Sequence, residues 1–430
     1  MRRGCMIWTG MMTHKAHDGD HPGISAGKGL KTRSLLLATA REVFQDKGFY
    51  GTSVSEISRR CGLSQGTFYQ YFKNKEQIFL EIADQIVAEF REAVIQPSRL
   101  GSGFPERVRT LMGLLLDHAL QYQYFHRILG EFELIDPVTI GYFDSLARFC
   151  RDFFRRETIR GEMRLLDPNL LAYMCIGMAL FQAFDWGPEQ ECFDQERLLE
   201  LLTDLLLSGI SGPKPWTQSI SERDLKNVLQ AGTHPDLRDQ TFPRGQVTKR
   251  ALFQAAEDVF GEVGFNRASV SEITRRAGVA QGTFYIHFQS KKDLMIGFVR
   301  YINRELRRHL KIATKHLTDR RDIEQGGMLA FFQFLKEHRR IYRVVSESET
   351  MGPNMGMWYY SKLAEGYVQG VRQGMAAGEI RDMPPVFLTR SLMGIQHMIG
   401  LKWLVWNYSP HAEVPLSLAV DAQRLVFFGL

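Results

Sequence analysis

Apolar residues recur at helical spacing through most of the chain, and no stretch alternates convincingly between apolar and polar residues as a half-buried strand does. Between residues 30 and 47 the apolar positions fall on one face of a helix, with lysines and arginines among the others. Similar patterns follow at 54–60, 65–71, 75–93, 108–122, 142–154 and 197–207, while 170–186 is apolar on nearly all sides, which predicts a buried helix. The pattern therefore predicts an all-α protein.

The ends of the first helices are marked by residues suited to caps and turns. Gly48 follows the first helix as a C′ residue, and Ser53 with Glu56 three positions later forms a capping box for the second. Gly62 suits the positive φ of a sharp turn between two helices. The sequence thus predicts two helices joined by a tight glycine turn.

The third predicted helix, at about 65–71, has only two turns and depends on its neighbours for stability. Phe68 and Phe72 lie four positions apart and are the expected anchors in a small core. This arrangement leaves the polar side nearer to solvent, at Gln65, Thr67, Tyr69 and Gln70.

The segment from Gly62 to Phe72 occurs a second time from Gly278 to Phe288, at an offset of 216 residues. About half of the positions from Ala40 to Lys75 are identical in the second copy, and fainter matches continue to Trp186 and Trp403. Repeats of this length are whole domains rather than solenoid turns. We therefore expect the entire unit to be duplicated.

Breaks in the helical pattern predict the domain boundaries. Glycine, serine and proline interrupt it near 97–105, a proline-rich stretch separates the two copies, and the first residues lack periodicity. The predicted division is a disordered tail at 1–27, a small helical domain at 28–95, a larger one at 96–210, a linker at 211–244, and second copies at 245–312 and 313–430. Met11 or Met12 could be the true start.

Positive charge is concentrated in the two small domains. The chain carries a formal charge of +6, and residues 28–82 hold nine Lys/Arg against five Asp/Glu while 244–298 hold eight against five. Such clustering suits a protein that binds a polyanion, although charge alone fits solvated helical faces better.

Other classes of function find little support in the sequence. The five cysteines have no regular spacing, which indicates reduced thiols in the cytoplasm, and no apolar run approaches the ~18 residues of a membrane span. Nucleophile, phosphate-loop and metal-ligand motifs are missing from the sequence. We expect no enzyme activity, no cofactor, no metal and no membrane contact.

The repeated segment has the layout of a helix-turn-helix. A helix about 10–12 Å wide fits a major groove of about 12 Å, where glutamine can pair with adenine and tyrosine or threonine can meet a thymine methyl or a phosphate. Lys75 and Lys291 begin the next helices, whose N-termini suit phosphate contact.

Both copies resemble the DNA-binding domain of the TetR family of bacterial transcriptional regulators. The resemblance covers about 50 residues in each copy and rests on Gly-Phe, a Thr/Ser cap, the Gly turn, Gly-Thr-Phe-Tyr, Phe and Lys. It implies two fused family units, each a helix-turn-helix head followed by a helical ligand and dimerisation domain. It also implies a DNA operator as partner and, by the family's habit, repression.

The resemblance implies DNA contacts at eight positions in each copy. Base edges are assigned to Gln65, Gly66 and Tyr69 with Gln281, Gly282 and Tyr285; phosphates are assigned to Ser53, Thr67, Tyr71 and Lys75 with Ser269, Thr283, His287 and Lys291; Gln70 and Ile286 complete the set. A packing role for Tyr69 and Tyr71 is the alternative.

The two copies differ within this set, because Ser64, Gln70 and Tyr71 become Ala280, Ile286 and His287. The family usually works as a homodimer on a palindrome. We therefore expect one chain to form the pseudo-dimer within itself and to read two non-identical half-sites. A dimer of such chains remains a second possibility.

The family's subunits meet through their last two helices, here about 168–186 with 197–207 and 384–406 with 416–428. Between head and seam the family holds a small ligand, and an apolar acyl or aromatic effector suits the candidate lining Met174, Met178, Phe181, Phe184, Met393, His397, Met398 and Trp406. Ordinary core packing is the preferred alternative for any single one of these.

The competing function is a ligand-sensing or protein-interaction scaffold that has lost DNA binding in one or both heads. The intact glutamine, threonine, tyrosine and lysine in both copies argue against it.

Overall fold

The computed structural model describes residues 26–95, 103–131, 136–184, 186, 193–217, 244–340, 345, 355–409 and 411–430. Throughout these ranges the secondary structure is helical, and the one β-bridge joins Ser211 and Ile380. The all-α prediction is confirmed. Most of the predicted tail and linker, with the candidate starts Met11 and Met12, lies outside the described residues.

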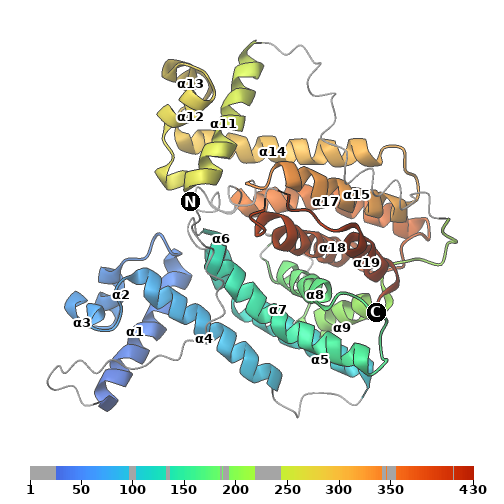
Figure 1. The fold of residues 1–430 in the computed structure, drawn as a ribbon, viewed down its shortest axis with the longest axis horizontal. Helices are drawn as coiled ribbons and strands as arrows, with labels where there is room; N and C mark the ends of the chain where they lie inside the picture. Colours follow the sequence, from blue (N-terminus) through green and yellow to red (C-terminus); the bar gives the residue numbers. More distant parts are fainter. Residues whose placement is uncertain are drawn as a thin grey trace, which may run out of the picture.

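The first unit runs from blue to green in Figure 1. Its helices are α1 (Ala26–Lys47), α2 (Val54–Arg60), α3 (Gln65–Tyr69), α4 (Lys75–Ile95), α5 (Phe104–Gln121), α6 (Gln123–Glu131), α7 (Asp136–Ile159), α8 (Pro168–Ala183) and α9 (Gln195–Ser208). We call α1–α4 head 1. Helix α3 ends two residues earlier than the sequence predicts, because Gln70 and Tyr71 form a turn.

The second unit repeats this order, from yellow to red. Its helices are α11 (Arg244–Arg267), α12 (Val270–Arg276), α13 (Gln281–His287), α14 (Lys291–Thr314), α15 (Arg320–Glu337), α17 (Met355–Ala376), α18 (Pro385–Gly400), the π-helix η4 (Leu401–Val405) and α19 (Leu416–Phe428). We call α11–α14 head 2. Helix α11 is kinked at Gly264, where φ is 77°.

The backbone of the two units turns at matching places. Among the described residues, positive φ occurs at four pairs of glycines: Gly48 and Gly264, Gly62 and Gly278, Gly161 and Gly378, Gly209 and Gly429. Since only glycine adopts this conformation readily, the pairs show that the duplicated sequence folds twice in the same way.

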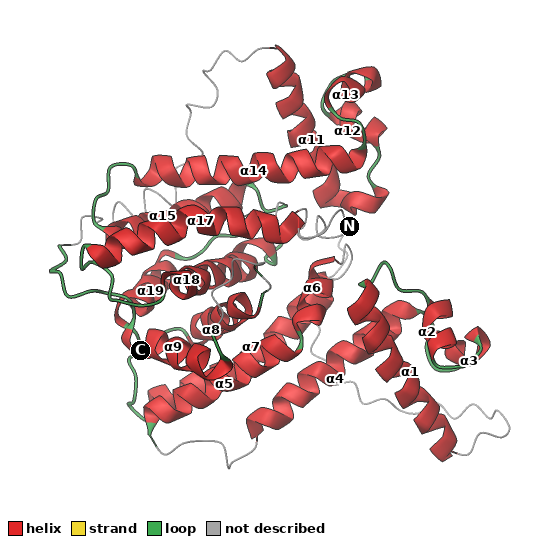
Figure 2. Ribbon diagram, turned by 180° about the vertical axis from the view of Figure 1, so that it is seen from behind, coloured by secondary structure: helices red, strands yellow, loops and turns green. Residues whose placement is uncertain are grey.

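The units are joined where α8 packs along α18 in the centre of the molecule (Figures 1 and 2). A Cβ on Gly177 would lie 2.2 Å from the carbonyl oxygen of Gly394, and a Cβ on Gly394 would lie 2.1 Å from that of Gly177. Gly177 also approaches Met398, as Gly394 approaches Phe181. Each contact is thus made in both directions at an offset of 217 residues, as across a twofold axis.

The C-terminal ends of α9 and α19 repeat this reciprocity. The amide of Ile210 donates to the carbonyl of Val426 at 2.9 Å, and the amide of Leu430 donates to that of Leu206 at 3.0 Å. An offset of 220 residues relates one bond to the other, because Leu430 corresponds to Ile210 and Val426 to Leu206. The helices α8, α9, α18 and α19 therefore form a seam between the units with internal pseudo-twofold symmetry.

The start of the linker differs from the sequence prediction. A linker is expected from residue 211, but residues 210–216 are held on the second unit. The amide of Gly212 donates to Glu379 at 2.8 Å, and the Trp216 indole donates to Asp322 at 3.1 Å and packs on Phe427. Backbone pairing between distant segments leaves no periodic signal, so the sequence could not reveal it.

Both heads lie on the same side of the molecule, at the left in Figure 1 and at the right in Figure 2. Among the described residues, no helix combines the length and the apolar character that crossing a membrane would require.

Candidate DNA-binding heads

Head 1 holds its short third helix by caps and by two buried rings. The Ser53 hydroxyl accepts from the Glu56 amide at 3.2 Å, and the Ser64 hydroxyl accepts from the Thr67 amide at 3.1 Å. Phe68 and Phe72 are fully buried, as the sequence predicts. In head 2, Ser269 caps α12 in the same way, but Ala280 gives α13 no side-chain cap.

The caps and rings leave one face of the third helix in solvent. Tyr69 is 55% exposed and Tyr285 56%, so neither ring belongs to the core of its head. The exposed predicted contacts are Ser53, Gln65, Gly66, Tyr69 and Gln70, with Ser269, Gln281, Gly282, Tyr285 and Ile286; those half-buried are Thr67, Tyr71, Thr283 and His287.

The third helix of each head, α3 or α13, is the recognition helix of the predicted helix-turn-helix. No close packing within the protein requires the glycine at its second position. A Cβ on Gly282 would meet nothing within 4 Å, and one on Gly66 would meet only the Ser64 hydroxyl at 3.6 Å. Glycine costs a helix about 1 kcal/mol relative to alanine. Both heads carry this cost at an exposed position where the sequence predicts a base contact.

Lys75 and Lys291 have partners that the sequence did not reveal. The Lys75 ammonium donates to the carbonyls of Phe49 at 2.8 Å and Thr52 at 3.0 Å, and it lies 4.3 Å from the centre of the Phe49 ring. Lys291 donates to Phe265 at 2.6 Å and Ala268 at 2.7 Å. Each lysine thus clamps the turn before the helix-turn-helix, while a direct phosphate contact remains a prediction.

The second helix of each head is stiffened by ion pairs on its surface. Glu56 accepts hydrogen bonds from Arg59, Lys47 and Arg60, which lower its pKa to about 2. Glu272 is held in the same way by Arg275 and Arg276, and its pKa is also lowered.

The predicted effector residues lie in and beside the seam. Met174, Met178, Phe181 and Met398 are fully buried, and Phe184, Met393, His397 and Trp406 are partly buried. Burial lowers the pKa of His397 to about 3, so its imidazole is neutral. Phe181 packs on His397 with ring centres 5.1 Å apart, and Trp406 stacks on Phe143 of the first unit.

A pocket of about 280 Å³ lies elsewhere, in head 2 between α11 and α14, and sequence reasoning missed it. None of the eight predicted effector residues lines it. The signal was present in the comparison of the two copies, because Glu81 of head 1 corresponds to Gly297 of head 2.

These features define a class of protein: a helix-turn-helix DNA-binding protein that carries two heads on paired helical cores. A family model described as "Bacterial regulatory proteins, tetR family" matches residues 36–82 and, separately, residues 252–297. The chain belongs to this family and is a transcriptional regulator, which confirms the family and function predicted from sequence.

Curated relatives agree with this assignment. "Uncharacterized HTH-type transcriptional regulator YdgC" of Bacillus subtilis (strain 168) is 38% identical over 171 residues, covering 35% of this chain and 78% of that protein. "Fatty acid metabolism regulator protein" of the same strain is 26% identical over 184 residues, covering 41% of this chain and 93% of that protein. Nearly whole relatives thus match less than half of this chain, as a tandem duplication requires.

Among solved structures, the fatty acid degradation regulator FadR from Bacillus halodurans is similar over 45% of this chain and 98% of its own, with 17% identity and a TM-score of 0.38.

Proposed function

We propose that one chain acts as a complete, two-headed regulator that binds one DNA operator with two non-identical half-sites. The observation that carries this proposal is the reciprocal seam, in which Gly177 meets Gly394 and the Ile210–Val426 hydrogen bond is matched by Leu430–Leu206. A twofold-related pair of heads on one side of a molecule suits two half-sites about one helical turn or a multiple of it apart.

In this proposal the exposed face of each recognition helix reads bases. Gln65 and Gln281 are placed to pair with adenine, and Tyr69 and Tyr285 to contact base edges beside the close approach allowed by Gly66 and Gly282. Ser53, Thr67 and Tyr71, with Ser269, Thr283 and His287, serve the phosphates. The domain limits follow the sequence, with DNA-binding domains at 28–95 and 245–312.

The half-sites differ because the heads differ on their exposed faces. Ile286 is 79% exposed where head 1 carries Gln70. An isolated isoleucine in solvent suits a thymine methyl, whereas glutamine offers a donor and an acceptor. Head 2 therefore favours a base pair with a more apolar major-groove edge than head 1 does.

The effector in this proposal is an apolar small molecule, and repression is its proposed output in the cytoplasm. The curated fatty acid metabolism regulator among the relatives suggests an acyl compound. Phe181, Tyr360 and His397 form an aromatic cluster beside the seam, with Phe181 5.5 Å from Tyr360 between ring centres. A ligand that enters there would shift α18 against α8 and so change the separation of the heads.

Selection of binding sites from a random duplex library with the full chain tests this proposal. The expected result is two different half-sites at a fixed spacing, with each half lost from the selection when the glutamine of one head, Gln65 or Gln281, is replaced by alanine. A perfect palindrome would count against non-identical heads. Enrichment of a single half-site, or of none, would favour the scaffold that has lost DNA binding.

A further inference from the structure

The pocket in head 2 lies where head 1 holds an internal ion pair. In head 1 the Arg33 guanidinium makes two hydrogen bonds to the Glu81 carboxylate and lies 5.2 Å from the centre of the Phe72 ring. In head 2 the Lys249 ammonium lies 5.2 Å from the centre of the corresponding Phe288 ring. The cation and the ring are kept, but the carboxylate is lost because Gly297 replaces Glu81.

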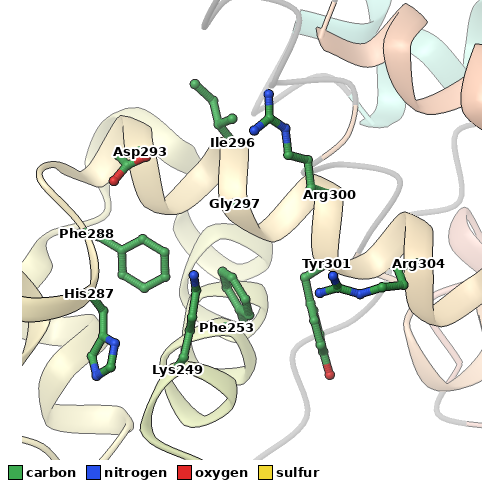
Figure 3. Close-up of a pocket in the computed structure, with 10 residues that line it drawn as sticks. All are labelled: Lys249, Phe253, His287, Phe288, Asp293, Ile296, Gly297, Arg300, Tyr301 and Arg304. Atoms are coloured by element: carbon green, nitrogen blue, oxygen red, sulfur yellow. The ribbon is translucent and has the colours of Figure 1, made fainter. Parts of the chain in front are cut away.

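The loss leaves space and unneutralised charge. Figure 3 shows Lys249 beside Phe253 and Phe288, whose ring centres lie 5.9 Å and 5.2 Å from its ammonium nitrogen, with the bare backbone of Gly297 on the neighbouring helix. Within the described parts of the chain, no carboxylate pairs with Lys249 or with Arg304, which also lines the pocket. Asp293 is the one acid among the lining residues, and it accepts from the Gln289 amide at 3.0 Å.

The walls of the pocket are flat rings. Phe253 and Tyr301 are stacked with ring centres 4.8 Å apart and an angle of 21° between their planes, and the lining ring of Phe288 packs on Phe253 with ring centres 5.4 Å apart. The volume of about 280 Å³ is just below the ~300–1,000 Å³ of sites for drug-sized ligands. The occupant is therefore small, with a flat apolar body.

The helix beside the pocket adds to the positive potential. Helix α14 carries seven lysines and arginines against two acids, whereas α4 carries two against five. Arg300 and Arg304 on the rim take the places of Asp84 and Ala88 in head 1. Cations of this density on a partly enclosed site concentrate anions from solution.

We propose that head 2 binds a small aromatic carboxylate in this pocket, with its carboxylate beside Lys249 in the place of the missing Glu81 side chain and its ring against Phe253 and Phe288. The site is separate from the seam and from the residues assigned to base edges, although it includes the predicted phosphate contact His287. His287 lines it from the end of α13, so an occupant touches the recognition helix of head 2 alone.

Benzoate is the probe, and its binding to the full chain is measured by saturation-transfer NMR with a concentration series. We expect saturable binding that weakens at least tenfold in Lys249→Gln, while Arg33→Gln, the same change in head 1, leaves it unaltered. Benzamide, which has the ring without the charge, should bind at least tenfold more weakly than benzoate.

Gly297→Glu supplies an internal carboxylate and should abolish benzoate binding. Its Cβ would lie 3.2 Å from the Phe288 ring, so Lys249→Gln remains the variant that leaves packing intact. No saturable benzoate binding, or equal binding to the wild type and Lys249→Gln, would overturn the proposal. So would a Lys249→Gln chain that has lost DNA affinity and one unit of its salt slope without any benzoate effect, because the pocket would then hold a DNA phosphate.

Discussion

The two heads share a backbone but differ in how each is tied to its helical core. In the first unit Glu89 of α4 pairs with Arg41 and accepts from the Tyr122 hydroxyl, and His118 lies 2.7 Å from the hydroxyl of Tyr142. In the second unit Glu257, which replaces Arg41, meets His338 at 3.1 Å. The comparison shows that duplication preserved the DNA-reading scaffold while the internal polar contacts diverged, so the two heads can respond differently to one environment.

The seam is the part of the molecule where the two units must remain alike, and breaking it should have the largest effect. Gly177→Val places a Cβ 2.2 Å from the backbone oxygen of Gly394, which cannot rotate away. We expect a loss of about 3 kcal/mol in the free energy of unfolding, the upper end of the usual cost of overpacking, measured by urea denaturation.

Gly141→Ala on α7 is the matched control, since nothing lies within 4 Å of its added Cβ. It should leave stability unchanged or raise it by up to about 1 kcal/mol. Equal effects of the two substitutions would mean that α8 and α18 do not touch in solution.

Removal of the turn clamps comes next in size. Lys75→Met and Lys291→Met each delete hydrogen bonds from a charged donor, which contribute about 1.5–3 kcal/mol. We expect each variant to destabilise its own head, seen by hydrogen exchange, and to weaken binding to all DNA sequences. If Lys75→Met weakens DNA binding but leaves exchange in head 1 unchanged, the lysine contacts phosphate directly; exposed Lys73→Met is the control.

The two heads should each discriminate among bases in a different half-site of the operator. Gln65→Ala removes a bidentate contact worth about 1–3 kcal/mol of discrimination at one base pair, and Gln281→Ala should do the same in the other half-site. Binding assays with single-base operator variants measure this. Relaxed choice at the same base pair for both variants would show that the heads are not assigned to separate half-sites.

A smaller difference lies in the cap of the recognition helix. Ser64 caps α3, but Ala280 gives α13 no side-chain bond. Ala280→Ser should stabilise α13 by about 1 kcal/mol and so slow its hydrogen exchange. Ser64→Ala should destabilise α3 by a similar amount and speed its exchange. No change in either helix would mean that neighbouring contacts alone fix these short helices.

The smallest expected effect is an opposite response to pH between 6 and 8. Burial lowers the pKa of His118 to about 4, so only the unfolded chain gains this proton as the pH falls, and His118 costs the first unit under about 1 kcal/mol of stability. Burial also acts to lower the pKa of His338, but the hydrogen bond and charge of Glu257 outweigh it and raise the pKa. The stability that His338 adds is therefore lost as the pH rises through its raised pKa.

Hydrogen exchange, corrected for its intrinsic pH dependence, measures both units in one sample. Protection of α5 should fall towards pH 6, and protection of α11 should fall towards pH 8. His338→Gln should remove the pH dependence of α11 and leave that of α5. Parallel trends for α5 and α11 in the wild type would contradict the opposite effects of His118 and His338.

The sequence predicted what depends on periodicity and on local signals. The glycine turn at Gly62 and the buried rings Phe68 and Phe72 could be anticipated, because each leaves a regular pattern or a repeated one, whereas the pairing of the last helices was implied by the family resemblance. The clamp by Lys75 could not, since it joins a helix start to carbonyls more than twenty residues earlier. For the head 2 pocket the sequence held only the change from Glu81 to Gly297, because a cavity also depends on which rings surround Gly297 in space.

The mass of the complex between the chain and its selected operator duplex tests the central claim most directly. Native mass spectrometry should show one chain on one duplex, and disruption of either half-site should weaken that complex strongly. Two chains on one duplex, or an unchanged complex when one half-site is scrambled, would contradict the account of a single polypeptide as a complete two-headed regulator.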